Sequence, residues 1–282
     1  MAIAPRIAAA LIVAVFTAGA LAQERRIDEL MRKSGIWQHL GQVQAAARLG
    51  AEEAREQAKA NPRPNDLTPA QHARMVAAMD KAFAPERLRA AMRTALLKEL
   101  SPADEGEVLE WLSTDLGTRI TRLEEQRDTA EQQSKMEREA PKVLESLPKE
   151  RLAKYERLAE SIQAGESSAN TIINVTTAIA YGIAIASPHG DVAMVKSIRE
   201  QMEAQRPQMV AALAQRSIAI FAYTYQPLTD EELEKYVAFA ESPAGKRYHD
   251  ATTRALDRVL AQASLDMGRD FGAKPLEIDR RS

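Results

Sequence analysis

The amino-acid sequence predicts an all-α protein, a multi-helix bundle built from two related helical halves. Residues with high helix propensity dominate, and only 12 of the 282 residues are glycine. Apolar residues recur at helical spacing in nearly every segment. Two segments, 100–121 and 228–248, also share one order of capping, aromatic and glycine residues. This shared order predicts a degenerate internal repeat.

Residues 1–22 have the three-part pattern of a secretory signal peptide. Arg6 precedes a short apolar run, and Ala20 and Ala22 form an A-x-A cleavage site. The run is shorter than the ~20 residues that a membrane span needs. We therefore expect cleavage between Ala22 and Gln23 and export to the periplasm. The alternative is a retained N-terminal anchor.

The composition excludes several classes of function. The chain has no cysteine, which rules out disulfides, a thiol nucleophile and a thiolate metal site. Its net charge of −2 gives no basic footprint for nucleic acid. The four histidines are scattered without a metal-binding pair, and no glycine-rich phosphate loop occurs. We therefore expect no metal, no cofactor and no nucleic-acid partner.

The N-terminal half, 23–140, has clear helix boundaries. A long helical stretch ends at Pro62 and Pro64, and a capped helix begins at Thr68 and Pro69. Pro85 starts the next helix, whose apolar face contains Leu88, Met92 and Leu96. The charged stretch 121–140 predicts a solvated helix and the seam between the halves. A partner-binding strip is the alternative for this stretch.

The C-terminal half, 141–271, contains an uncharged stretch at 167–190. Its length would permit a membrane crossing, but Asn, Ser and Thr residues dilute its apolar character. We expect a central core helix here, with a membrane segment as the alternative. Asp191 is a candidate N-cap for the following helix, which Pro207 kinks or divides. The tail, 272–282, lacks periodicity and is expected to be loose.

The segment 228–271 predicts a helical hairpin. Thr229 and Glu232 form a capping box at its start. Ser242 then caps the second helix, with Pro243 at its first position. Gly245 falls at the third position, where the serine hydroxyl can accept from its backbone N–H and the two helices can pack closely.

The stretch LTDEELEKYVAFAESPAGKRY in this hairpin resembles the bacterial domain-of-unknown-function family 2059. The similar features are an acidic capped helix, the aromatic Phe239, and the S-P-x-G-K/R motif that follows it. The resemblance covers a minority of the chain, about 228–271. It implies short α-helices in an exported protein, without an established biochemical activity.

The repeat at 100–121 aligns with the hairpin without gaps. The identical pairs are Leu100 and Leu228, Gly117 and Gly245, and Arg119 and Arg247. The similar pairs are Ser101 and Thr229, Asp104 and Glu232, Trp111 and Phe239, and Thr114 and Ser242. Asp115 stands in place of Pro243, so the first joint is expected to be looser. We interpret the shared order as an internal duplication.

Two chemical interpretations apply to the second joint. A Ser242, His249 and Asp250 triad is disfavoured because neighbouring residues on a helix point about 100° apart. Lys246 and Arg247, with Arg119, are candidates for holding an anion or a partner near a helix N-terminus. The alternative is surface pairing of these cations with Glu231, Glu232 or Glu241.

The sequence therefore favours an exported binding or interaction module of the cell envelope, and not an enzyme. Its partner is expected to be an unidentified protein or envelope component. Two rival functions stay open. One is an envelope hydrolase that uses carboxylates at unassigned positions, and the other is a protein attached to the membrane through 167–190.

Overall fold

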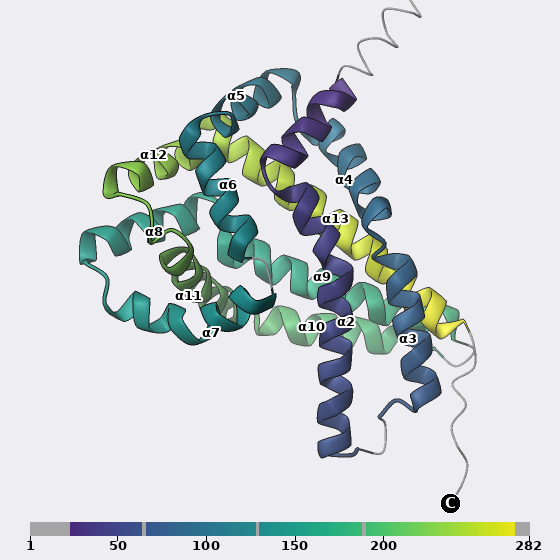
Figure 1. The fold of residues 1–282 in the computed structure, drawn as a ribbon. Coiled ribbons are helices and arrows are strands. Elements are labelled where there is room, and N and C mark those ends of the chain that lie inside the picture. Colours follow the sequence, from purple (N-terminus) through teal and green to yellow (C-terminus); the bar gives the residue numbers. More distant parts are fainter. Residues whose placement is uncertain (1–22, 64–65, 128–129, 188–189, 274–282) are drawn as a thin grey trace, which may run out of the picture.

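The computed structural model describes residues 23–63, 66–127, 130–187 and 190–273, and these residues form helices joined by short connections (Figure 1). A helix over residues 23–33 comes first. The others are α2 (Ile36–Ala60), α3 (Pro69–Ala82), α4 (Pro85–Glu99), α5 (Pro102–Leu112), α6 (Asp115–Arg127), α7 (Ala130–Glu145), α8 (Lys149–Ser161), α9 (Ala164–Ala186), α10 (Val192–Ala204), α11 (Arg206–Thr224), α12 (Asp230–Glu241) and α13 (Pro243–Gly272). The all-α, multi-helix fold class is therefore confirmed.

Local capping residues set many of these boundaries. Thr68 and Thr229 each accept a hydrogen bond from a backbone N–H in the first turn and complete a capping box. Asp191 caps α10 through two backbone N–H groups. Pro207 lies in the first turn of α11 and separates it from α10. Gly35 adopts a φ of 75°, which permits the break between the first helix and α2.

Two apolar cores hold the helices together. The first core is formed by the N-terminal helix, α2 to α5, and much of α13. The second is formed by α6, α8, α11 and α12 with the start of α9. Trp111 and Phe239 pack against both cores. The tightly buried part of the molecule therefore spans both sequence halves.

These cores do not follow the predicted boundary between 23–140 and 141–271. Helix α13 belongs to the second half, but Tyr248 and Ala255 lie in the first core. Helix α6 belongs to the first half, but Ile120 lies in the second core. The division into two helical halves stays a prediction, and each of the two cores contains helices from both ranges.

Helix α13 is the long diagonal helix in Figure 1, and it packs along α9 more extensively than any other described pair of helices. Gly182 and Gly268 lie at this crossing. A Cβ atom on Gly268 would be 3.1 Å from the Cα of Gly182. Glycine is therefore required on both sides for the two backbones to approach this closely.

Helix α9 is the one described helix that is long and apolar enough to cross a membrane by length and composition. It packs against α13, α11, α10 and α8. Ile173 and Thr177 are buried in these contacts, whereas Tyr181 and Ile185 are 42% and 40% exposed. One face of α9 is thus a core face, and the other face is partly open.

Two predicted terminal segments fall largely outside the described residues. The signal peptide, 1–22, lies wholly outside them. The predicted loose tail began at Gly272, but that residue ends α13 and Ala273 follows as its C-cap. Residues 274–282 lie outside the described range.

Candidate functional site

The predicted joint of the C-terminal hairpin is a tight corner between α12 and α13. The Oγ of Ser242 accepts a hydrogen bond from the N–H of Gly245 at 3.0 Å and donates one to the Phe239 carbonyl at 2.7 Å. Pro243 occupies the first turn of α13. The serine hydroxyl therefore joins the end of one helix to the start of the next, as a capping residue does.

The corner between α5 and α6 has the same hydrogen bonds. The Oγ1 of Thr114 accepts from the N–H of Gly117 at 3.0 Å and donates to the Trp111 carbonyl at 2.7 Å. Asp115 replaces the proline of the other corner without changing these contacts. The similarity that the sequence indicates at 100–121 and 228–248 thus extends to the local geometry.

The two corners face one another through reciprocal contacts. The rings of Trp111 and Phe239 stack with their centroids 4.6 Å apart and their planes 8° from parallel. These two residues occupy equivalent positions in the two similar segments. Contact between equivalent residues is typical of two surfaces that are related by a two-fold axis.

The ion pairs across this interface are reciprocal too. Arg119 donates to Glu232 at 2.7 Å, and Arg247 donates to Asp104 at 2.6 Å. Arg119 and Arg247 occupy equivalent positions in the two segments, and so do Asp104 and Glu232. Each arginine therefore pairs with the equivalent carboxylate of the other segment. A hydrogen bond from Ser101 and the nearby Arg247 hold the pKa of Asp104 below its ordinary value, against the opposing effect of burial.

These contacts separate the three cations that the sequence groups as an anion or partner site. Arg119 and Arg247 are neutralised by carboxylates of the facing corner. Lys246 lies elsewhere, at the edge of a polar cavity of about 630 Å³ that also contains Arg157 and Glu241. The arrangement favours the ion-pair interpretation for both arginines, and Glu232 is one of the partners that the sequence suggests.

The side chains of the disfavoured triad have other partners. The hydroxyl of Ser242 donates to a backbone carbonyl, and Asp250 accepts from Gln163 at 3.4 Å. His249 packs edge-on against Phe239, and burial lowers its pKa to about 4. The neutral imidazole of His249 is therefore part of the packing beside the Trp111 and Phe239 stack.

One position breaks the correspondence between the two corners. Glu105 of α5 is fully buried where α12 has the fully buried Leu233. The Nε of Arg26 lies 3.3 Å from this carboxylate. Burial raises the pKa of Glu105, while Arg26 and Gln23 oppose the rise. The carboxylate is thus held in an environment that suits a leucine.

We expect Glu105→Leu to raise the free energy of unfolding by about 1 kcal/mol at pH 8, because a buried ion pair is often less stabilising than an apolar side chain. Since the folded-state pKa of Glu105 is raised, the wild-type chain loses stability as the pH rises from the unfolded to the folded pKa. The gain from the variant should therefore grow between pH 4 and pH 8. Urea denaturation at both pH values measures it.

Glu107→Leu is the matched control, because Glu107 lies on the exposed face of the same helix. It removes the same charge without relieving a buried carboxylate. A loss of stability in Glu105→Leu at pH 8, with no change in Glu107→Leu, would show that the ion pair with Arg26 stabilises the fold.

A groove between α9, α10 and α13 is the best-defined candidate binding site. Its volume is about 580 Å³. Each helix contributes side chains spaced i, i+3, i+4 and i+7, which form one face of a helix. These faces run from Asn174 to Tyr181 on α9, from Val192 to Arg199 on α10, and from Arg258 to Leu265 on α13.

Helix α10 forms one wall of this groove and is loosely packed. None of its residues is buried, and it contacts mainly α9. Val192 and Met194 are 49% and 62% exposed. Of the large apolar side chains that are exposed in the described part of the chain, most lie on α9 and α10. Two of these side chains, Tyr181 and Val192, line the groove.

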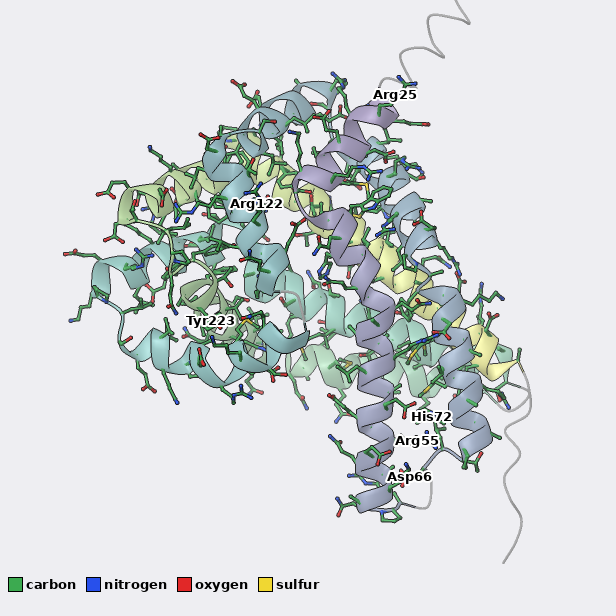
Figure 2. The ribbon with its side chains drawn as sticks, viewed as in Figure 1. Arg25, Arg55, Asp66, His72, Arg122 and Tyr223 are labelled. Carbon is green, nitrogen blue, oxygen red and sulfur yellow. The ribbon has the colours of Figure 1, made fainter. Side chains whose placement is uncertain are left out.

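A second cavity, of about 480 Å³, lies between α2 and α3 at the projecting end of this helix pair. Figure 2 shows Arg55, Asp66 and His72 at this end. His72 is buried, and its Nε2 lies 3.4 Å from the Ala51 carbonyl oxygen. The connection beside it includes residues 64–65, which are outside the described range, so the groove is the better-defined site.

Sequence reasoning missed the groove, although part of its signal was present. The uncharged character of 167–190 indicates α9, and Asp191 indicates the start of α10. The contribution of α13 could not be inferred, because Arg258 and Leu265 are distant from α9 in sequence. Within the described residues, no group of three His, Asp or Glu side chains is placed to bind a metal.

No protein-family model, curated protein or solved structure matches this chain. The similarity to domain-of-unknown-function family 2059 at 228–271 therefore stays a prediction from the residues themselves.

Proposed function

We propose that this chain is an exported binding module of the bacterial cell envelope, and that the groove between α9, α10 and α13 takes an apolar ligand. The groove is the observation that carries the proposal. Half of its lining residues are apolar or aromatic and the other half are polar or cationic, and small-molecule sites likewise combine apolar surface with polar groups that orient the ligand. The loosely packed α10 can move to admit a ligand without disturbing either core.

The periplasmic location is part of the same proposal. It rests on the signal-peptide pattern in 1–22, with cleavage between Ala22 and Gln23, and on the resemblance at 228–271 to a family of exported proteins. The interface at the two corners contributes to the fold, because Trp111, Phe239 and the paired arginines are engaged within the chain. Ligand binding is therefore assigned to the groove.

The test uses the chain from Gln23 and an uncharged apolar fluorophore, N-phenyl-1-naphthylamine. We expect its fluorescence to rise in the groove and to be lost in Ala261→Trp, because the indole would fill the space beside Gln262 and Leu265. Ala90→Trp, on the exposed surface of α4, is the matched control and should bind normally. Equal binding by both variants would place the fluorophore elsewhere and defeat the proposal.

The two rival functions make different predictions. A protein anchored through α9 would remain with the membrane after salt washing, whereas the proposed module would be recovered in the periplasmic fraction without detergent. An envelope hydrolase would turn over peptidoglycan, ester or phosphate substrates. Turnover that a single carboxylate change abolishes would replace the binding proposal.

A further inference from the structure

The charged side chains that line the groove are all cationic. Tyr181 is the other ionisable residue of the lining. Lys196 and Arg199 of α10 and Arg258 of α13 line it, and no carboxylate does so in the described part of the chain. The rest of the lining is apolar or neutral. The lining therefore combines a hydrophobic surface with cationic side chains whose carboxylate partners lie outside the groove.

The carboxylates near these cations are shared with other arginines. Glu99 accepts from both Arg254 and Arg258, at 3.0 Å each. Glu203 lies 3.8 Å from Arg199 but only 2.7 Å from Arg206. The hydrogen bond from Arg206 is the main reason why the pKa of Glu203 is lowered. Arg258 therefore shares its carboxylate with Arg254, whereas Arg206 also bonds Glu166 and leaves part of Glu203 to Arg199. Asp257, which accepts from Asn174, is a further carboxylate near this end, but neither it nor Glu99 nor Glu203 lines the groove.

The remaining pair is weak enough to exchange. Lys196 lies 3.6 Å from Glu200, and the two side chains are 79% and 66% exposed. Exposed pairs of this kind contribute little to stability, because water and salt screen them. An anion bound in the groove could therefore take over the lysine ammonium without breaking a structural contact.

The positive charge is concentrated toward one end of the groove. Helices α9 and α13 run in the same direction, since Asn174 bonds Asp257 and Gly182 lies against Leu265 and Gly268. Helix α10 runs the opposite way along α9, as Figure 1 shows.

The direction of α10 determines toward which end of the groove Arg199 lies. Arg206, just after α10, bonds Glu166 near the start of α9 at 3.1 Å. Arg199 therefore lies toward the same end of the groove as Asn174 and Arg258. Val192 lies toward the other end.

The opposite end of the groove is apolar. Tyr181 and Leu265 are the last lining residues on α9 and α13, and Val192 is the first on α10. The seven-residue steps between the ends correspond to about 10 Å along a helix axis. The groove is thus polarised along its length, with a cationic end and an apolar end.

From this polarity we infer that the ligand is a single-chain amphiphile with an anionic head, a carboxylate or a phosphate. The head lies near Asn174, Arg199 and Arg258, and the chain extends toward Tyr181, Val192 and Leu265. The inference rests on the proposed function, because it names the ligand class of the same groove. Charge-assisted hydrogen bonds from guanidinium groups select the head, and apolar burial retains the chain.

The test displaces the fluorophore with probes that share a ten-carbon chain, namely decanoate, decyl phosphate, decanol and decyltrimethylammonium. At low ionic strength we expect the anions to bind about tenfold or more tightly than decanol, the strength expected of hydrogen bonds to charged groups. The cation should bind most weakly. The advantage of the anions should shrink as salt is added. Whichever anion binds better identifies the head group.

Charge-removing variants locate the effect. Arg199→Gln combined with Arg258→Gln should remove most of the advantage of decanoate over decanol, measured as the ratio of the two affinities within the same variant. Arg216→Gln is the control, because Arg216 is exposed on α11 and pairs with Glu137 away from the groove. The side chains of Arg199 and Arg258 are both more than half exposed, so we expect the fold to survive their replacement.

The outcomes separate this inference from the proposed function. Equal binding of decanoate and decanol, with no effect of the double variant, would overturn the anionic head and leave an apolar groove. Absence of binding by every probe, or binding that Ala261→Trp does not reduce, would overturn the proposed function itself. Tighter binding of the cationic probe would also overturn the inference.

Discussion

Replacing Gly245 with leucine is expected to lower the free energy of unfolding by about 3 kcal/mol or more, at the upper end for overpacking a close-packed interior. A Cβ atom at this position would lie inside the van der Waals surface of the Phe239 carbonyl oxygen and 3.2 Å from the Cα of Ala240. Both obstacles belong to the backbone, so no side-chain rotation relieves the clash. The corner between α12 and α13 would have to open.

Opening this corner would also disturb the stack of Trp111 on Phe239. Urea denaturation of the chain from Gln23 measures the loss. Ser242→Ala gives the comparison, because it removes only the capping hydroxyl and should cost ~1 kcal/mol. Gly50→Leu is the control, since nothing lies within 4 Å of a Cβ at Gly50. If Gly245→Leu were no more destabilising than Gly50→Leu, the close packing at the corner would be refuted.

Gly268→Leu is expected to have a comparable effect, also about 3 kcal/mol or more, for the same steric reason. A Cβ atom there would clash with the Ile179 carbonyl oxygen and approach the Cα of Gly182. A leucine would therefore push α13 away from α9. Because both helices line the groove, this variant should lose fluorophore binding together with stability.

The same variant tests the place of α9 in the fold. If α9 left α13 to enter a membrane, Gly268 would face no neighbour and a leucine would be tolerated there. Unchanged denaturation of Gly268→Leu in the purified chain from Gln23 would therefore contradict the packed position of α9. Gly50→Leu again reports the effect of a leucine on an exposed helix.

The helix boundaries could be predicted because their causes are local. Thr68, Thr229 and Ser242 each bond a backbone N–H three residues onward. Proline and glycine likewise act within one turn of their own position. The fold class follows from the same short-range patterns, so it could be predicted without knowledge of any contact between distant helices, and the structure confirms it.

The packing of distant helices could not be predicted in the same way. Nothing in the sequence near Tyr248 indicates that its helix joins the first core, and nothing near Ile120 indicates the second. The alignment of Arg119 with Arg247 suggested one shared role, an anion site, where the structure gives each arginine its own carboxylate. The reciprocal arrangement separates the two arginines, and the pairing of Arg119 with Glu232 agrees with the other interpretation, surface ion pairs.

The reciprocal corners have a consequence for how the chain can diversify. Contacts of this kind normally join two identical subunits, in which every substitution appears twice. Here the two partners lie on one polypeptide, so each can change alone. Glu105 is buried on one side while Leu233 is kept on the other. The groove likewise is lined by α13, which follows the second corner, while α6, which follows the first, contributes no residue to it.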